Sequence, residues 1–338
     1  MELASEGQEQ HGISTTEQSE FTTEDTSFNE YILTDSQLAQ IKLFEDLNFA
    51  SFIIYKVMAV LIAISNLIII IAVLKYKNLR SSTNILIVSL AFADLLNSPS
   101  LLLARMHYYI PIGKYYDIYI KIVACLPHAL TVTSVAASHI TFTFMSIERW
   151  LAVTFPLKFK SLVTTKKMII AVAVSWLYAF PIPFTLVMYY AWQKPMEFYE
   201  KPFTIMDIIP LPVFTFLGPV NYCLNITLMI CFYISIAVTL KRRSNFQNQH
   251  SNVMTTQNTK RVTQMTFIIL ALFIIIWVPY TIAVVFAEKI AKTTAGYIGF
   301  QILLYLISAN SFMNIFIYAW KNKAFRDAFK DMLCCGKL

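Results

Sequence analysis

A glutamate followed by an arginine, Glu148-Arg149, closes the third of seven long apolar stretches in this 338-residue chain. Opposite charges at adjacent positions can pair with each other, and near the edge of a membrane the low dielectric strengthens the pair. The same arginine can instead contact another protein, so the pair has the properties of a two-state switch. For Arg149 alone, the simpler interpretation is an interfacial arginine that reaches toward lipid phosphate.

Asp94 is the only carboxylate well inside any of the seven stretches. An isolated ionised acid is costly in hydrocarbon, so this carboxyl group is either protonated or met by polar groups. Asn310 and Asn314 are four residues apart and share a helix face. The polar side chains available to meet Asp94 are Asn66, Ser138, Asn310, Ser311 and Asn314. These residue types predict either a hydrated cation site of oxygen ligands or a hydrogen-bonded network without an ion.

The elements that must position these groups are the apolar stretches themselves. Apolar residues make up 57% of the chain and charged residues 14%, and a helix needs about 20 mostly apolar residues to cross the hydrocarbon. The stretches lie near residues 51–74, 83–105, 120–147, 168–191, 208–240, 263–287 and 298–319. A membrane β-barrel would show short alternating segments instead. We therefore predict an all-α membrane protein, a seven-transmembrane helix bundle over residues 47–320.

Lysine and arginine residues set the expected orientation, because positively charged connections stay in the cytoplasm. Most of the 27 Lys and Arg residues lie in the connections on one side, and the first 46 residues carry many acids but a single base, Lys42. We expect residues 1–46 to be a disordered acidic extracellular tail. Residues 321–338 are expected to form an amphipathic helix and a short cytoplasmic tail. The net charge of +7 then favours anionic membrane lipid and a cytosolic partner over nucleic acid.

Several motifs on successive stretches resemble the rhodopsin-like family of G-protein-coupled receptors, over nearly the whole chain from about residue 51 to 335. Leu90-Ala91-Phe92-Ala93-Asp94 matches the family's Leu-Ala-x-x-Asp, Glu148-Arg149-Trp150 resembles Asp/Glu-Arg-Tyr, and Asn314-Ile315-Phe316-Ile317-Tyr318 resembles Asn-Pro-x-x-Tyr. Further matches are Asn66, Trp176, Phe273 and Trp277-Val278-Pro279. Each motif alone is weak, but their number and order make the resemblance specific.

The resemblance implies a plasma-membrane receptor that binds an extracellular ligand and activates heterotrimeric G proteins through outward movement of helix six. It implies that Arg149 pairs with Glu148 in the inactive state and engages the G protein in the active state. Pro279 should bend helix six, because proline removes a backbone donor and clashes one turn back. The implied activation switch consists of Glu148, Arg149, Trp150, Tyr233, Phe273, Trp277, Pro279, Asn314 and Tyr318.

The resemblance also assigns a cation site and a ligand pocket. Asp94, Ser138, Asn310, Ser311 and Asn314 match the family's allosteric sodium pocket, which favours a sodium ion over the ion-free network; no other cofactor is expected. The pocket candidates by position are Thr131, Ser134, Trp277, Tyr280, Val284, Tyr305 and Ser308. Each of these side chains can alternatively be interior packing.

Departures from the family pattern narrow the expected ligand. Thr131 stands where amine receptors place an aspartate, so a protonated amine would lack a counter-ion. Helix seven has no lysine between Lys292 and Lys321, which excludes a retinal Schiff base there. Trp150 replaces the motif tyrosine, Ile315 replaces the helix-seven proline, and His139 stands where an aliphatic residue is usual, near Phe273.

The five cysteines predict no bridge of the kind usual in this family. Cys125 lies near the outer end of the third stretch, but the second outer loop, about residues 192–207, contains no cysteine. Cys223 and Cys231 are expected to be small buried apolar residues. Cys334 and Cys335 suit palmitoylation, with a reduced, unmodified pair as the alternative.

In lacking this bridge, the chain resembles the branch of the family that contains the melanocortin, lysophospholipid, cannabinoid and adenosine receptors. Residues 317–335 are similar to melanocortin receptor tails, and residues 155–164 to the second inner loop of adenosine receptors. Neither stretch touches a ligand, so the ligand class stays open.

Two other classes of protein remain alternatives at this point. A multi-span transporter or channel often has an internal repeat with Gly- or Pro-broken helices, yet the chain has only seven glycines and no evident repeat. An intramembrane enzyme would need a nucleophile with a base or a metal set, and no such motif occurs. We therefore predict a receptor and not an enzyme, with a multi-span transporter or channel as the alternative.

Overall fold

Long apolar stretches form helices in a membrane because a helix satisfies its backbone hydrogen bonds within its own segment. The computed structural model describes residues 35–103, 117–200, 203, 205–247, 254–286, 290 and 293–333. Contacts divide the chain into two units, residues 1–46 and residues 47–338. Secondary structure in the described residues is helical throughout, without strands.

Seven helical segments among the described residues are long and apolar enough to cross a membrane, which confirms the predicted fold class. They are Glu45–Lys75, Ser82–Leu103, Ile118–Thr154, Thr165–Trp192, Leu211–Arg242, Phe267–Val285 and Thr294–Lys321. The helices that build them are α1 (Asp35–Lys75), α2 (Ser82–Leu103), α3 (Asp117–Thr154), α5 (Thr165–Ala179), α6 (Pro181–Trp192), α8 (Leu211–Thr215), α9 (Asn221–Gln247), α10 (Met254–Val285) and α12 (Thr294–Lys321).

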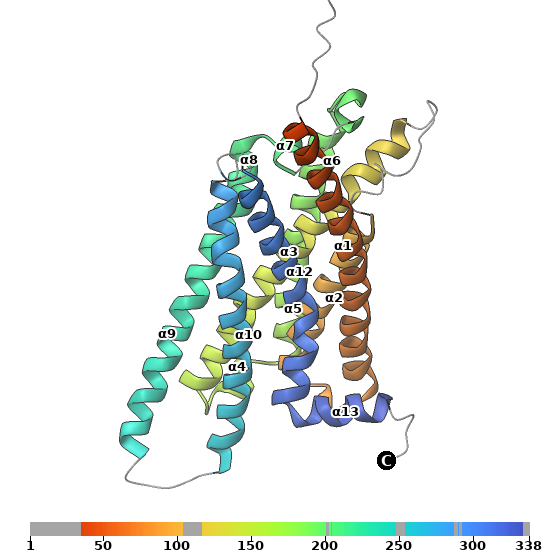
Figure 1. Ribbon diagram of the computed structural model, residues 1–338. Helices are drawn as coiled ribbons and strands as arrows, with labels where there is room; N and C mark the ends of the chain where they lie inside the picture. Colours follow the sequence, from red (N-terminus) through yellow and green to blue (C-terminus); the bar gives the residue numbers. More distant parts are fainter. Residues whose placement is uncertain are drawn as a thin grey trace, which may run out of the picture. The chain divides into compact units, whose positions relative to one another are not determined.

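Short helical elements connect the spans or follow the last one, except η4, which lies inside the fifth span. They are η1 (Lys77–Leu79), α4 (Phe159–Leu162), η3 (Met196–Glu200), α7 (Ile205–Ile208), η4 (Phe216–Val220) and α13 (Lys323–Leu333). Figure 1 shows α13 turned across the end of α12. Helix α3 packs against α2, α5, α6, α9 and α10, so it is the central element of the bundle.

Proline residues interrupt two of the spans. The fourth span divides at Phe180 because Pro181, the first residue of α6, cannot donate a backbone hydrogen bond. The fifth span contains the π-helical turn η4, with Pro219 inside it. In α12, where Ile315 replaces the family's proline, the helix runs unbroken from Thr294 to Lys321.

The largest buried cluster lies among α1, α2, α3, α9, α10, α12 and α13 and includes Phe142, Phe273, Trp277 and Tyr318. Outward faces are also apolar, as at Leu177, which is 72% exposed. In a membrane protein the interior and the outer face of the bundle can both be apolar, because lipid tails surround the outer face. For this reason the prediction for Cys223 and Cys231 is wrong: both are exposed on α9.

Helix α13 is the amphipathic segment predicted after the seventh span. Asn322 caps it, with its side-chain oxygen accepting from the backbone N–H of Ala324 at 3.0 Å. Phe325 and Phe329 are buried in the large cluster, and the Phe325 ring stacks on Tyr318 at 5.2 Å. Cys334 and Cys335, the predicted lipidation sites, lie outside the described residues.

The loop after α6 is fixed to α3 without a disulfide. Tyr199 of η3 is buried, donates its hydroxyl to the Ala191 carbonyl oxygen, and lies 3.6 Å from the Cys125 Sγ, which donates to it. Burial, followed by the hydrogen bond with Cys125, raises the pKa of Tyr199 well above its usual range. A neutral tyrosine therefore occupies the place beside Cys125.

Candidate functional site

The charge pair predicted from sequence lies at one end of α3 and is almost completely buried, with Glu148 1% and Arg149 6% exposed. Nε and Nη2 of Arg149 both donate to the Glu148 carboxylate. A two-pronged contact of this kind is the strong form of an arginine–carboxylate pair. Burying two charges is costly unless their remaining hydrogen-bonding capacity is met.

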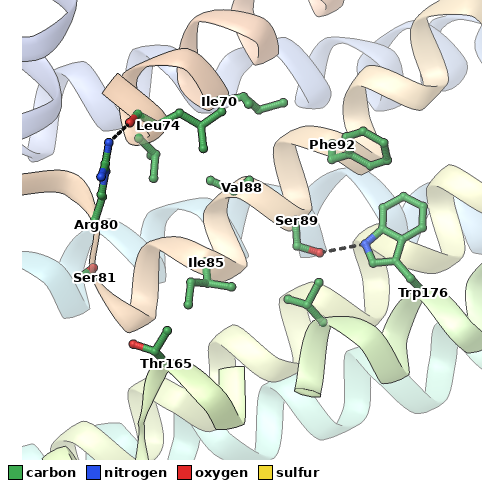
Figure 2. Close-up of a pocket in the computed structure, with 12 residues that line it drawn as sticks. Ile70, Leu74, Arg80, Ser81, Ile85, Val88, Ser89, Phe92, Thr165 and Trp176 are labelled. Atoms are coloured by element: carbon green, nitrogen blue, oxygen red, sulfur yellow. Dashed lines mark hydrogen bonds between the residues drawn. The ribbon is translucent and has the colours of Figure 1, made fainter. Parts of the chain in front are cut away.

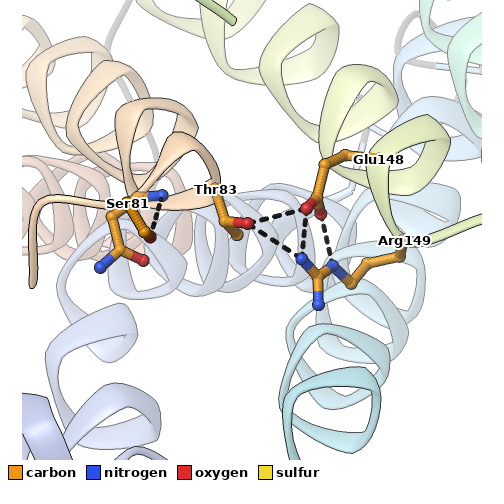
Figure 3. Close-up of polar contacts among 5 residues, drawn as sticks. Ser81, Thr83, Glu148 and Arg149 are labelled. Atoms are coloured by element: carbon orange, nitrogen blue, oxygen red, sulfur yellow. Dashed lines mark hydrogen bonds and ion pairs between the residues drawn. The ribbon is translucent and has the colours of Figure 1, made fainter. Parts of the chain in front are cut away.

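A threonine on α2 completes this network, as Figure 3 shows. The Thr83 hydroxyl donates to Glu148 Oε1 at 2.7 Å and accepts from Arg149 Nη2 at 3.1 Å. The sequence analysis missed Thr83. Thr83 is the second residue of α2, and only the packing of α2 against α3 shows that its side chain contacts Glu148.

Trp150 joins α3 to α9. Its indole Nε1 donates to the Ser235 hydroxyl at 3.0 Å, and its ring contacts Phe155 and Phe232. The residue that departs from the family's tyrosine therefore has a defined structural role, because it is hydrogen-bonded between two spans.

Two predicted switch tyrosines have buried hydroxyls without a hydrogen-bond partner among the described residues. They are Tyr233 on α9 and Tyr318 on α12. The Tyr233 ring lies 5.8 Å from Phe267 of α10. An unpaired buried polar group costs about 1–3 kcal/mol, so both hydroxyls favour any rearrangement that gives them partners.

Aromatic rings surround His139 at the centre of the bundle. Its ring stacks on Tyr222 at 4.6 Å and meets Trp277 edge-on at 4.3 Å and Phe273 at 4.8 Å. Its Nδ1 lies 2.7 Å from the Val135 carbonyl oxygen, whereas Nε2 is buried and has no partner in the part of the chain that the structure describes. Trp277 stands two residues before Pro279 in α10, so this aromatic group is attached to the predicted hinge.

A cavity of about 20 Å³ lies beside Asp94 and is bordered by four of the five predicted sodium ligands: Asp94, Ser138, Asn310 and Ser311. The fifth, Asn314, donates its Nδ2 to Asp94 Oδ2 at 3.0 Å. A space of this size holds one water-sized sphere. Asn66 Nδ2 donates to the Ser311 carbonyl oxygen at 3.0 Å, while its Oδ1 is buried and meets no hydrogen-bond donor of the described residues.

The donor set fits a sodium ion. One carboxylate with neutral hydroxyl and amide oxygens is the ligand type that hard cations prefer, and Asp94 is only 5% exposed. Asn97, which the sequence analysis did not select, also borders the cavity. The spacing of three residues from Asp94 was the signal that could have identified it, because such residues share a helix face.

The predicted ligand-pocket residues do not all meet at this cavity. Ser134 and Trp277 border it, whereas the Tyr305 hydroxyl donates to Ser51 of α1 at 2.6 Å. The Ser308 hydroxyl donates to the Leu304 carbonyl oxygen of its own helix at 3.0 Å. The other candidates are Thr131, whose hydroxyl lies 2.8 Å from that of Ser100, Tyr280, whose ring contacts Trp277 at 5.5 Å, and Val284, which is buried.

A larger pocket of about 470 Å³ lies between α1, α2 and α5 and contains none of the predicted site residues (Figure 2). Its walls are mostly apolar, and two of the lining residues, Leu74 and Phe92, are exposed on the outside of the bundle. Trp176 closes one end and donates to the Ser89 hydroxyl at 3.1 Å. This pocket therefore belongs to the outer, apolar surface and not to the polar interior.

One family of known proteins matches most of the chain, including the residues described above. The sequence matches the family described as 7 transmembrane receptor (rhodopsin family) over residues 65–318. The match includes Asp94, the Glu148-Arg149 pair, the Trp277–Pro279 segment and Tyr318, all of which the structure places inside one bundle. Proteins of this family are generally receptors and not enzymes. The chain belongs to the rhodopsin family and is a seven-span membrane receptor.

Proposed function

We propose that this receptor binds an extracellular ligand and activates heterotrimeric G proteins by outward movement of α10. The observation that carries the proposal is the buried network of Glu148, Arg149 and Thr83 at one end of the bundle. In this network Arg149 donates its hydrogen bonds to Glu148 and Thr83, two residues of the bundle itself. An arginine held in this way becomes available to a partner only after the helices rearrange, which is the behaviour required of a switch.

The movement is a shift between two populated states. Pro279 gives α10 a flexible point next to the Trp277 and Phe273 rings, and these rings pack against His139 of α3. A ligand that binds better to the state with α10 outward increases the population of that state by its difference in affinity. Tyr233 and Tyr318 contribute, because their unpaired hydroxyls can gain partners in the second state.

We also propose that a sodium ion binds at Asp94 and stabilises the state described here. Ser138, Asn310 and Ser311 border the same cavity, and Asn314 is hydrogen-bonded to the carboxylate. When bound, the ion neutralises the single buried negative charge of the site. The chain's own part is to fix the oxygen atoms around the cavity, and an ion that fits only this arrangement opposes the movement of α12 and α3.

The distribution of charge supports a plasma-membrane location with the N-terminus outside and the C-terminus inside. In this arrangement residues 1–46 form an acidic extracellular tail, and the basic connections face the G protein and anionic lipid. Palmitoylation of Cys334 and Cys335 would attach the segment after α13 to the membrane.

The first experiment measures the activation of a panel of G-protein subtypes in cells that display the full chain, with pooled lipid, peptide and metabolite ligands. We expect one subtype to respond, and we expect Arg149→Ala to abolish the response at equal surface expression. Arg80→Ala is the matched control, because Arg80 is an exposed arginine in the connection between α1 and α2, one of the basic connections proposed to face the cytoplasm. A response that survives Arg149→Ala contradicts the proposed role of the pair.

A further inference from the structure

A line of polar side chains connects α2 and α3 next to Asp94. Asp94, Asn97 and Ser100 are spaced three residues apart on α2, so they share one face of the helix. The Ser100 hydroxyl donates to Asn97, with its Oγ 2.9 Å from the backbone oxygen and 3.0 Å from the side-chain Oδ1. From α3, the Thr131 hydroxyl lies 2.8 Å from the Ser100 hydroxyl. These contacts hold the Asn97 amide in place.

Asn97 also borders the cavity beside Asp94. Asn97 is 7% exposed and borders the same space of about 20 Å³ as Asp94, Ser134, Ser138, Asn310 and Ser311. The Ser134 hydroxyl donates its proton to the Ala93 carbonyl oxygen at 2.8 Å, which leaves its oxygen lone pairs for another group. Six oxygen-bearing side chains therefore surround a space for one ion, and only one of them carries a formal charge.

We propose that Asn97 is an additional oxygen ligand of the sodium ion at Asp94, and that Ser100 and Thr131 orient its amide for this purpose. This inference rests on the sodium site of the proposed function and adds a ligand and its support from α2. A single carboxylate among neutral oxygens favours a monovalent over a divalent cation. Since Thr131 is also a predicted ligand-pocket residue, the same contacts link the position of a bound ligand to the ion.

The test is a sodium titration of thermal stability, which needs neither a ligand nor a G protein. Purified full-length receptor is heated at a constant total salt concentration while sodium chloride replaces choline chloride. An ion that binds only the folded state raises the unfolding midpoint in a saturable manner. We expect this rise in the unmodified receptor and its loss in Asp94→Asn.

Asn97→Leu replaces the amide with an apolar side chain of similar size. We expect the sodium concentration for the half-maximal rise to increase about tenfold or more, the scale found when a group that supports a metal site is removed. Ser98→Ala is the matched control: Ser98 is buried on the same helix, but its hydroxyl donates to Ala59 of α1 at 2.8 Å. It should lower the midpoint at every salt concentration and leave the sodium response unchanged.

Two further variants keep the test decisive if Asn97→Leu does not fold. Ser100→Ala keeps the amide but removes its support, so the half-maximal sodium concentration should rise by a smaller factor. Asn97→Asp adds a second carboxylate, which should create a stabilising response to calcium that the unmodified receptor lacks.

The outcomes separate this inference from the proposed function. An unchanged sodium response in Asn97→Leu, or in Ser100→Ala when the first variant is unfolded, overturns the role of Asn97 while the Asp94 site stands. Absence of any sodium response in the unmodified receptor overturns both sodium assignments. A receptor that activates no G protein, but whose sodium response requires Asp94 and Asn97, contradicts only the proposed signalling.

Discussion

At the scale of single residues, Thr83 is the side chain that holds the Glu148–Arg149 pair in one arrangement. Its hydroxyl serves both partners at once, as a donor to Glu148 and an acceptor from Arg149. Thr83→Val keeps the shape and removes the hydroxyl. Loss of a hydrogen bond to a buried charge costs about 1–3 kcal/mol, and this cost falls on the state described here.

We therefore expect Thr83→Val to increase ligand-independent nucleotide exchange on the G protein, measured with purified receptor in lipid nanodiscs. Thr141→Val is the control, because Thr141 is a buried threonine on α3 whose hydroxyl lies 3.4 Å from Ser89 and not near the charge pair. Basal exchange that is unchanged or lower in Thr83→Val would show that the hydroxyl does not restrain Arg149.

The sequence predicted the residue types of the site better than their partners. Glu148, Arg149 and Asp94 stood out because charge is rare inside apolar stretches, which is itself a physical signal. Thr83 and Ser235 could not be found in this way, because threonine and serine are common in helices and only the packing of α2 and α9 brings them to α3. His139 was selected as unusual, but its stacking on Tyr222 depends on the position of α9.

At the scale of elements, a hydrogen-bonded tyrosine fixes the loop after α6. Tyr199 joins η3 to the end of α6 through Ala191 and to α3 through Cys125. Phe198 and Phe203 pack around its ring. Such an attachment is noncovalent and insensitive to reducing agents, whereas a disulfide is covalent and is cleaved by them.

Tyr199→Phe should keep the ring packing and lose the hydrogen bonds, a loss of about 0.5–1.5 kcal/mol. We expect faster amide hydrogen exchange in residues 193–200 and little change elsewhere. Tyr190→Phe, a neighbouring tyrosine on α6, is the control. Dithiothreitol should leave the exchange of the unmodified loop unchanged, and a large acceleration by the reductant would contradict attachment through Tyr199.

The seven spans were predictable because length and composition decide whether a segment crosses a bilayer. The break at Phe180 and the π-helical turn at Phe216–Val220 were not predicted, since proline permits several local geometries and the neighbouring helices select one. Cys223 and Cys231 show a related limit: composition cannot tell the lipid-facing side of a membrane helix from its interior side when both are apolar.

At the scale of the whole molecule, the proposed function requires that the bundle has two arrangements and that the contacts of the buried Glu148–Arg149 pair differ between them. If the proposal holds, a G protein that engages Arg149 favours the arrangement with α10 outward, because coupling between two sites is reciprocal. We therefore expect the G protein alone, without a ligand, to shift the population.

The most direct measurement of this claim is the distance between spin labels at Asn78 and Phe267, both exposed, in a receptor whose Cys223, Cys231, Cys334 and Cys335 are changed to serine. Pulsed electron paramagnetic resonance measures the distribution of distances between the two labels, with and without nucleotide-free G protein. The measurement is made in the receptor with Arg149 and in the Arg149→Ala variant. We predict a shift to longer distances on addition of G protein, and no shift in Arg149→Ala. A distribution that stays the same while the G protein is bound would contradict the outward movement of α10.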